Sequence, residues 1–428
     1  MNRFFTICCL LCLLFSTDNG VAHGVTLDLD DCVRQVFANN PALSLSRIDT
    51  VEKELLLQSV RKNRYPALSF QYDYLRQHEP LPTLGLENYY SYGVTLTQPV
   101  YKGNSLVTGV QLGELNLELA GTTLSKTKND VAYQVHEAYF KVLKAKKLSE
   151  VAAQAVEQLQ SHRRDAAAFY EVGLIPKNDL LQSEVLLAQG EQDLLRAKNS
   201  LSLARAALNL LMRRNVDAEL ELVDILQHEP KQVDWTETVH QAMENRPELV
   251  QARIAVQQAE KGITIARAPY LPSVALSATY KRQGDSFDAY SYSLGDEETR
   301  YAMASLSWNF WTWRQGKNEV AAARQRERKS MQAQEQVIDA ITLELKDAIL
   351  NLELADENIK VTEKAIEQAE ENFRINTARY QSQLATSTEV LDAQTLLTQT
   401  RSNYYNALYD YNLAGSKLEW ALGVLAAE

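Results

Sequence analysis

The sequence lacks long apolar runs and, over much of its 428 residues, the residues that break helices. No stretch reaches 18 continuous apolar residues, so we expect no helix to span a membrane. No proline follows Pro272, and no glycine lies between residues 317 and 414. Ala, Leu, Glu, Lys and Gln dominate such tracts, which are much longer than ordinary globular helices. The sequence therefore predicts helices of unusual length.

Cysteine is also scarce once the first segment is set apart. Residues 1–22 are expected to be a signal peptide, because a basic start precedes a 12-residue apolar run and small polar residues follow. Three of the four cysteines lie in this segment, so the mature chain would keep only Cys32. A disulfide framework is thereby excluded. Cys32 matches Thr238 in the duplication described below, which predicts a packed helix residue.

Charge and missing motifs narrow the possible functions. The net charge of −11 argues against nucleic acid or anionic lipid as a partner. The six histidines form no pair with metal-ligand spacing, and no nucleophile elbow, phosphate loop or dinucleotide fingerprint occurs. We therefore expect no enzymatic activity, no bound metal and no cofactor.

The chain contains the same structural unit twice. Three residues of the first half recur 206 positions later: Pro41, Pro66 and Tyr74 become Pro247, Pro272 and Tyr280. The offset then grows to 210, since Tyr170 answers Tyr380. This period is far beyond the 20–50 residues of solenoid repeats, so a whole unit is duplicated. We expect a first repeat at residues 23–215, an acidic linker at 216–233 and a second repeat at 234–428.

Each repeat is expected to contain one very long helix, over about residues 104–170 in the first. In the helical segment after it, large apolar residues recur every seven positions. A second series, of small residues, follows each of them three positions later. In the first repeat the large residues are Leu180, Leu187, Leu194, Leu201 and Leu208, and the small ones are Ser183, Gly190, Ala197 and Ala204. Large and small residues in such register let helices approach closely and supercoil. Shorter helices are expected at residues 41–63 and 248–268.

Two segments before each long helix alternate apolar and polar residues with a period of two, as strands do. They cover about residues 68–74 and 90–97, and then 274–281 and 302–310. Their length suits a tilted strand that crosses a bilayer, and aromatic residues crowd their ends as at membrane interfaces. Four strands cannot close a membrane barrel, because the smallest have eight. Such a barrel must be shared between chains; a soluble hairpin over a core is the alternative.

Several motifs together resemble the TolC-type outer-membrane efflux proteins, over about residues 27–423. They are the opening segments LDLDDCVRQVFANNPAL and VDWTETVHQAMENRPELVQAR, the strand starts RYPALSF and YLPSVALS, the turn YEVGLIPKNDLL, and STEVLDAQTLL ahead of NYYNALYDYNLAGSKLEWALG. The resemblance implies a homotrimer, mostly α with a small β part. Each chain would give four transmembrane strands to one 12-stranded β-barrel, and the long helices would form a periplasmic α-helical barrel.

The implied function is that of the outer-membrane channel in a tripartite efflux or type I secretion system. The implied partners are a periplasmic adaptor (membrane fusion) protein, an inner-membrane pump of the RND or ABC type, and outer-membrane lipid. The linker would help to form an equatorial region around the helices. A non-conducting coiled-coil scaffold that spans the periplasm remains the alternative, and the exported substrate stays open.

Three groups of residues match the family's periplasmic tip. Val172, Gly173 and Leu174 match the turn to which an adaptor docks. Glu389 and Asp392 match an acidic constriction, where the family carries Asp at the first position; three residues apart, they share a helix face. Tyr380 and Asp179 match a pair that holds the tip closed.

The residues themselves also allow simpler roles for these positions. Gly173 suits a plain helix C-cap, and acidic residues are favoured at a helix start by the helix dipole. A second closing pair of the family would need an arginine where this chain has Ala385. That link is therefore missing or replaced.

Overall fold

The structure, a computed structural model, describes residues 26–76, 88–230, 233–290 and 298–426. The expected signal peptide at residues 1–22 lies outside the described residues. The first repeat contains α1 (Leu29–Asn39), α2 (Pro41–Lys62), β2 (Ala67–Arg76), β3 (Asn88–Lys102), α3 (Ser105–Glu171) and α4 (Lys177–Leu211). The second contains α5 (Trp235–Asn245), α6 (Pro247–Arg267), β5 (Ser273–Gly284), β6 (Glu298–Ser307), α7 (Gln315–Gln381) and α8 (Ser387–Leu422).

The two repeats have the same elements in the same order, and both long helices, α3 and α7, have 67 residues. The short helices begin alike. The Asp28 carboxylate caps α1 by accepting the Asp31 N–H at 2.6 Å, and Asp234 caps α5 by accepting the Glu237 N–H at 2.9 Å. The duplication and the long helices are confirmed. Among the described residues, none of the helices is long and apolar enough to cross a membrane.

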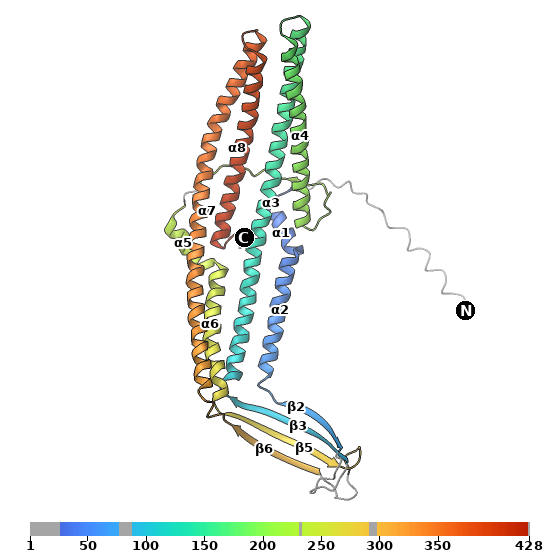
Figure 1. Cartoon of the computed structure of the whole chain (residues 1–428), viewed down its shortest axis with the longest axis vertical. Coiled ribbons are helices and arrows are strands. Elements are labelled where there is room, and N and C mark those ends of the chain that lie inside the picture. Colours follow the sequence, from blue (N-terminus) through green and yellow to red (C-terminus); the bar gives the residue numbers. More distant parts are fainter. Residues whose placement is uncertain (1–25, 77–87, 231–232, 291–297, 427–428) are drawn as a thin grey trace, which may run out of the picture. The chain divides into compact units, whose positions relative to one another are not determined.

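The chain forms two compact units, and each takes segments from both repeats. Unit 1 comprises residues up to 40, 132–231 and 352–416, and unit 2 comprises residues 41–131, 232–351 and 417–428. The long helices α3 and α7 contribute to both units (Figure 1). The compact units therefore differ from the sequence repeats.

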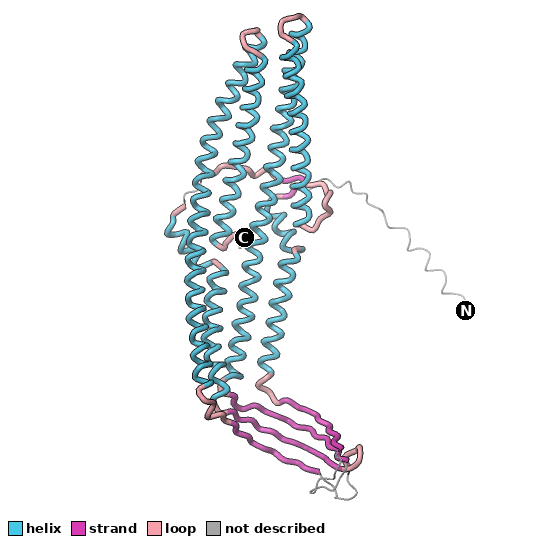
Figure 2. The backbone as a smooth tube through the Cα atoms, in the orientation of Figure 1, coloured by secondary structure: helices cyan, strands magenta, loops and turns pink. Residues whose placement is uncertain are grey.

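Unit 2 contains an open, fully antiparallel sheet in the order β2-β3-β5-β6 (Figure 2). The inner strands β3 and β5 come from different repeats, so the duplication builds one sheet. α2 leads into β2 and β3 leads into α3, while α6 leads into β5 and β6 leads into α7. The antiparallel order therefore places all four helix connections at the same end of the sheet.

The expected fourth strand, residues 302–310, is wrong at its end. β6 stops at Ser307, and residues 308–310 lie outside the sheet. Ser307 pairs with Ser273, the first residue of β5, so the residues beyond it have no strand to pair with. Apolar and polar residues still alternate beyond Ser307, but β5 has no residues there with which they could pair.

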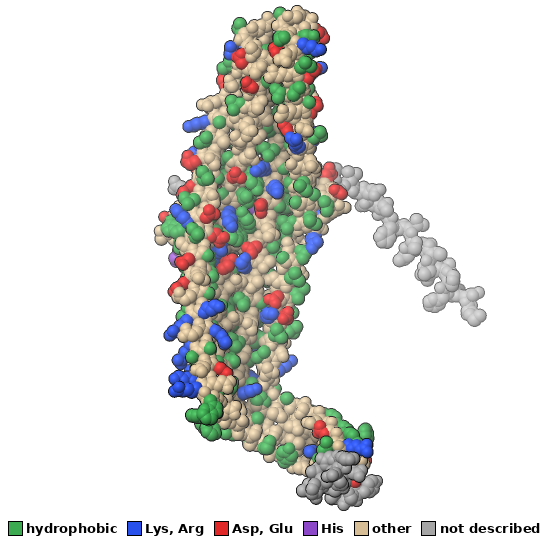
Figure 3. Space-filling model, in the orientation of Figure 1, with side chains coloured by type: hydrophobic (Ala, Val, Ile, Leu, Met, Phe, Trp, Pro, Cys, Tyr) green, Lys and Arg blue, Asp and Glu red, His purple; other side chains and the backbone are tan. Residues whose placement is uncertain are grey.

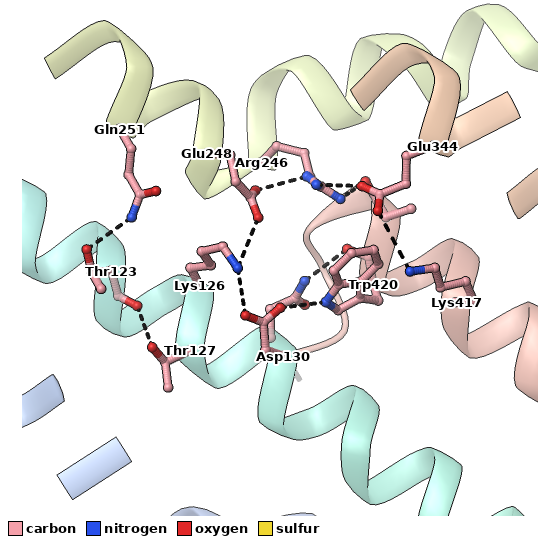
Figure 4. Close-up of polar contacts among 12 residues, drawn as sticks. Thr123, Lys126, Thr127, Asp130, Arg246, Glu248, Gln251, Glu344, Lys417 and Trp420 are labelled. Carbon is pink, nitrogen blue, oxygen red and sulfur yellow. Dashed lines mark hydrogen bonds and ion pairs between the residues drawn. The ribbon is translucent and has the colours of Figure 1, made fainter. Parts of the chain in front are cut away.

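The end of α8 is anchored in unit 2 by a buried cation at the α5–α6 junction (Figure 4). Arg246 is 4% exposed; it donates to the Ala421 carbonyl at 3.1 Å and to Glu344 at 2.7 Å. Its guanidinium lies 5.0 Å from the centre of the Trp420 ring. The Trp420 indole N–H donates to Asp130 of α3 at 2.9 Å. Segments of α3, α7 and α8 thus meet at the α5–α6 junction.

Unit 1 packs α4 through the predicted heptad seam, and every residue of the two series in α4 is buried or partly buried. A Cβ added at Gly190 would lie 2.8 Å from a methyl group of Leu159, so α3 and α4 approach closely there. Cys32 is fully buried, and burial raises the pKa of its thiol to about 12. It is a packed helix residue, as predicted.

The linker after α4 packs along helices of both repeats within unit 1. Its strand β4 (Glu221–Leu222) pairs in parallel with β1 (Thr26–Leu27). The Tyr139 hydroxyl of α3 donates to the Val223 carbonyl at 2.7 Å, and Lys147 lies 2.6 Å from Asp224. Asn412 of α8 donates to the Gln227 carbonyl at 3.0 Å. These contacts fix the linker to the middle of the helices.

Candidate functional site

The turn between α3 and α4, here the first tip turn (residues 172–174), is a Schellman cap. The Leu174 N–H donates to the Phe169 carbonyl at 2.9 Å, and the Gly173 N–H donates to the Tyr170 carbonyl at 3.0 Å. Gly173 has φ +75°, the left-handed conformation that this cap requires. Val172 and Leu174 are exposed, at 69% and 52%. Two apolar side chains are thereby held in solvent on a fixed turn.

The turn between α7 and α8, the second tip turn (residues 382–384), repeats this geometry. The Leu384 N–H donates to the Arg379 carbonyl at 2.7 Å, and the Gln383 N–H donates to the Tyr380 carbonyl at 2.9 Å. Gln383 has φ +63°. The substitution of glycine by Gln383 weakened the match in sequence, yet the backbone of the turn is the same. The backbone bonds therefore impose a left-handed conformation on a residue with a side chain.

Glu389 takes part in a capping box at the start of α8. Its carboxylate accepts the Thr386 N–H at 3.2 Å, and its own N–H donates to the Thr386 hydroxyl at 3.3 Å. Arg379 lies 3.5 Å from the same carboxylate. The Thr386 backbone bond, with Arg379 as a smaller cause, lowers the pKa of Glu389, which stays ionised at neutral pH. This is the simpler, helix-start role allowed by the sequence.

Asp392 lies one turn further along α8 and is exposed, as Glu389 is. Both follow the second tip turn directly, and their spacing puts them on one helix face. The structure therefore presents two carboxylates side by side at the start of α8, one held by its cap and one exposed. Such a pair can attract cations.

Tyr380 and Asp179, the predicted closing pair, are not joined by a hydrogen bond within the described part of the chain. The Tyr380 side chain is 3% exposed. Burial, together with the nearby carboxylate of Asp179, raises the pKa of the hydroxyl. The ring of Tyr380 packs against the rings of His162 and Phe169, at 4.8 Å and 5.4 Å between centroids.

His162 and Ser387 complete this part of the site, and sequence reasoning missed both. The His162 ring nitrogen Nε2 lies 2.8 Å from the Ser387 hydroxyl, which joins α3 to the start of α8. His162 is 7% exposed, and burial lowers its pKa, so the ring is neutral at pH 7. The partners are 225 residues apart, and no local pattern marks either position.

Comparison with known proteins identifies the chain. The sequence pattern of the family described as "Outer membrane efflux protein" matches residues 32–212 and 238–424, which together span most of the chain. The chain belongs to the outer membrane efflux protein family. This family is one of transport proteins. The chain is thus an outer-membrane efflux channel protein with most of its mass in the periplasm.

Individual efflux proteins are similar along most of their length. "Outer membrane protein TolC" of Vibrio cholerae serotype O1 is 23% identical over 79% of this chain and 77% of that protein. "Cobalt-zinc-cadmium resistance protein CzcC" of Cupriavidus metallidurans is 24% identical over 76% of this chain and 75% of that protein. The solved structure of the Campylobacter jejuni CmeC outer membrane channel has a TM-score of 0.81, 15% identity and coverage of 92% and 85%. It supports the fold alone.

Proposed function

We propose that this efflux protein acts as a homotrimeric duct, exporting substrates delivered by a periplasmic adaptor and an inner-membrane pump of the RND or ABC type. The open sheet carries the argument for a trimer. β2 and β6 are the edge strands, and every residue in both is exposed. A bilayer leaves no water for unpaired backbone groups, so a membrane-spanning sheet must close on itself. Three copies of the four-stranded sheet would supply twelve strands, above the minimum of eight.

Cross-linking tests this closure. Ser69→Cys in β2 is combined in turn with Met303→Cys, Ser305→Cys or Ser307→Cys in β6, in a Cys32→Ala background. In one chain β3 and β5 separate these strands, so any disulfide must join two copies. We expect at least one pair to give covalent dimers and trimers in membranes under oxidising conditions. Monomers alone for every pair would rule out the shared sheet.

We further propose that the first tip turn docks the adaptor. Exposed apolar side chains that keep one rigid conformation suit a protein interface, because little conformational freedom is lost on binding. Val172 and Leu174 have these properties, and the Schellman bonds of Gly173 hold them in place. The docking role and the cap role are compatible, since the cap creates the presented surface.

We assign the constriction of the duct to Glu389 and Asp392. Threefold repetition of the chain would bring up to six carboxylates together, and a ring of carboxylates selects cations in a pore. Tyr380 and Asp179 would act on closure. Because no hydrogen bond joins Tyr380 to Asp179 within the described chain, their contact in the closed trimer would come from rearrangement or a neighbouring copy. The substrate itself is left open by these residues.

A further inference from the structure

The two repeats make the same turn between their last strand and their long helix, but with residues of very different kinds. In the first repeat Gly103 and Asn104 have φ +57° and +69°. At the equivalent positions of the second, 210 residues later, Trp313 and Arg314 have φ +48° and +69°. Glycine and asparagine tolerate this left-handed conformation, whereas tryptophan and arginine adopt it only under strain. Strain held at one defined place is a reason to look for a function.

Charge differs between the repeats at the same place. Residues 314–329 contain six Lys or Arg and two Glu, whereas the equivalent residues 104–119 contain no Lys or Arg and two Glu. The basic side chains gather over the start of α7, beside a group of hydrophobic side chains (Figure 3). The acidic chain thus has a local basic surface at the start of one of its two long helices, which its net charge of −11 conceals.

A cavity of about 570 Å³ lies at this turn, entirely within unit 2. We call it the α7 turn cavity; its lining includes Arg267, Trp308, Phe310, Arg314, Lys317 and Arg324. None of the four cations in this lining has an acidic partner in the part of the chain that the structure describes. Glu319, the nearby acid, is engaged with the Tyr270 hydroxyl at 2.6 Å. The positive charge of the cavity is therefore not neutralised by these contacts.

Aromatic side chains line or adjoin the same cavity and point away from the core. Trp308, Phe310 and Trp311 are 54%, 78% and 68% exposed, and Trp313 is 85% exposed. Trp308 is held in place, since its indole N–H donates to the Tyr270 carbonyl at 3.1 Å. Exposed indoles at fixed positions are typical of the membrane–water interface, where their apolar rings and polar N–H groups are both satisfied.

The position of the cavity agrees with that environment. All four helices meet one end of the sheet, and the helices of this outer-membrane protein lie in the periplasm. The α7 turn cavity therefore lies level with the periplasmic leaflet, which in an outer membrane consists of phospholipids. Guanidinium groups bind phosphate oxygens in a bidentate way, and basic pockets beside membrane-spanning segments bind anionic headgroups.

We propose that the α7 turn cavity is a binding site for one anionic phospholipid of the periplasmic leaflet. Arg314 and Lys317, with Arg267 and Arg324, hold the phosphate, and the exposed indoles pack against the glycerol and upper acyl chains. The strained Trp313–Arg314 turn presents both kinds of contact at once. The cavity at the equivalent turn of the first repeat has no tryptophan in its lining and two cations, Arg64 and Lys102, in place of four.

Native mass spectrometry of the intact protein in a neutral detergent tests the proposal. Phosphatidylglycerol is the probe, and phosphatidylcholine with the same acyl chains is the reference. We expect one phosphatidylglycerol per chain, bound at least tenfold more tightly than phosphatidylcholine. Trp313→Gly with Arg314→Asn installs the turn of the first repeat, which removes strain and should fold normally; binding should fall at least tenfold.

A second variant removes charge alone: Arg267→Gln, Lys317→Gln and Arg324→Gln should also weaken binding at least tenfold. Its matched control is Arg326→Gln, Arg328→Gln and Lys329→Gln, an equal charge change at exposed positions outside the cavity lining, which should keep binding.

Four results would overturn the proposal. The first is equal affinity for phosphatidylglycerol and phosphatidylcholine, and the second is an equal loss of binding in the control variant. The third is displacement of the lipid by millimolar inorganic phosphate. The fourth is loss of both lipid binding and oligomers in the variant with Trp313→Gly and Arg314→Asn. The third would make free phosphate the ligand, and the last would assign the tryptophans to a contact between copies.

Discussion

Gln383 adopts in the second tip turn the left-handed backbone conformation that Gly173 adopts in the first, with φ +63° and +75°. Each residue donates its N–H to a helix carbonyl three residues earlier, at 2.9 and 3.0 Å. The two turns thus hold their bonds equally well, but only one has a residue suited to the conformation. Fixed backbone bonds in both tips indicate that the turn geometry matters more than the residue that makes it.

Gln383→Gly should therefore stabilise the protein, by about 1 kcal/mol, because a side chain in the left-handed region costs about 1–2 kcal/mol and glycine avoids most of it. Chemical denaturation followed by circular dichroism would measure the change. Gln381→Gly, two residues earlier in the last turn of α7, is the matched control and should be destabilising. The same sign for both variants would show that Gln383 carries no strain.

Acidification should weaken the contact between His162 and Ser387. Burial lowers the pKa of His162 below its ordinary 6.5. As the pH falls, the ring is therefore protonated in the unfolded state before it is protonated in the folded state. The stabilisation is present above pH 6.5 and is lost as the pH falls toward the folded pKa. The negative charge of Asp165 opposes this shift of the pKa without cancelling it.

Thermal melts between pH 8 and pH 5 would detect this loss. His162→Gln keeps a polar partner for Ser387 but does not titrate, so its melting temperature should depend less on pH. His240→Gln, at an exposed histidine, is the control and should behave as the parent does. If both variants keep the parent's full pH dependence, His162 does not titrate in this range.

The second repeat has the same series of small residues in α8 (Ala393, Thr400, Ala407, Ala414 and Ala421), and this seam should not tolerate bulk. Ala407 is 6% exposed, so Ala407→Leu would overpack the contact, which typically costs about 1–3 kcal/mol. Ala188→Leu, the same change at an exposed position of α4, should be nearly silent. The denaturation midpoints of the two variants would be compared with that of the parent. Equal midpoints for the two variants would contradict the assignment of Ala407 to a closely packed seam.

Adaptor docking should depend on the two exposed residues of the first tip turn. Val172→Ser with Leu174→Ser should reduce export in cells at least about tenfold, the effect of losing a contact worth roughly 2 kcal/mol in an interface. Trimer formation and conductance should remain, because neither side chain is buried. Leu195→Ser, at a position 68% exposed on α4, serves as control and should export normally. Normal export by the tip variant would remove the turn from the interface.

Local patterns predicted most of the fold. The long helix expected over residues 104–170 is Ser105–Glu171, and the strand expected at 68–74 is Ala67–Arg76. The bounds of both elements follow from the periodicity of apolar residues and from the position of helix breakers, and these signals lie within the segments themselves. The end of β6 was missed because it depends on where β5 begins, 34 residues earlier.

The site was less predictable, because its contacts join distant segments. The His162–Ser387 contact and the Arg246–Glu344 ion pair each link residues about 100 or more positions apart, with no signal in either local sequence. The capping role of Glu389 was visible, since Thr386 stands three residues before it. The packing of Tyr380 against the His162 and Phe169 rings was not visible, because those residues lie more than 200 positions away in the sequence.

Single-channel recording in planar bilayers would show whether the protein is an export duct with a cation-selective constriction at Glu389 and Asp392. The variant is Glu389→Gln with Asp392→Asn, which removes the charges while an amide oxygen can still accept the Thr386 N–H and preserve the cap. The control is Glu191→Gln with Asp193→Asn, an equal charge change at exposed positions of α4. We expect the parent and the control to conduct and to be blocked by divalent cations from the periplasmic side, and the variant to conduct with at least tenfold weaker block. Conductance with unchanged block in the variant, or no conductance by the parent, would contradict it.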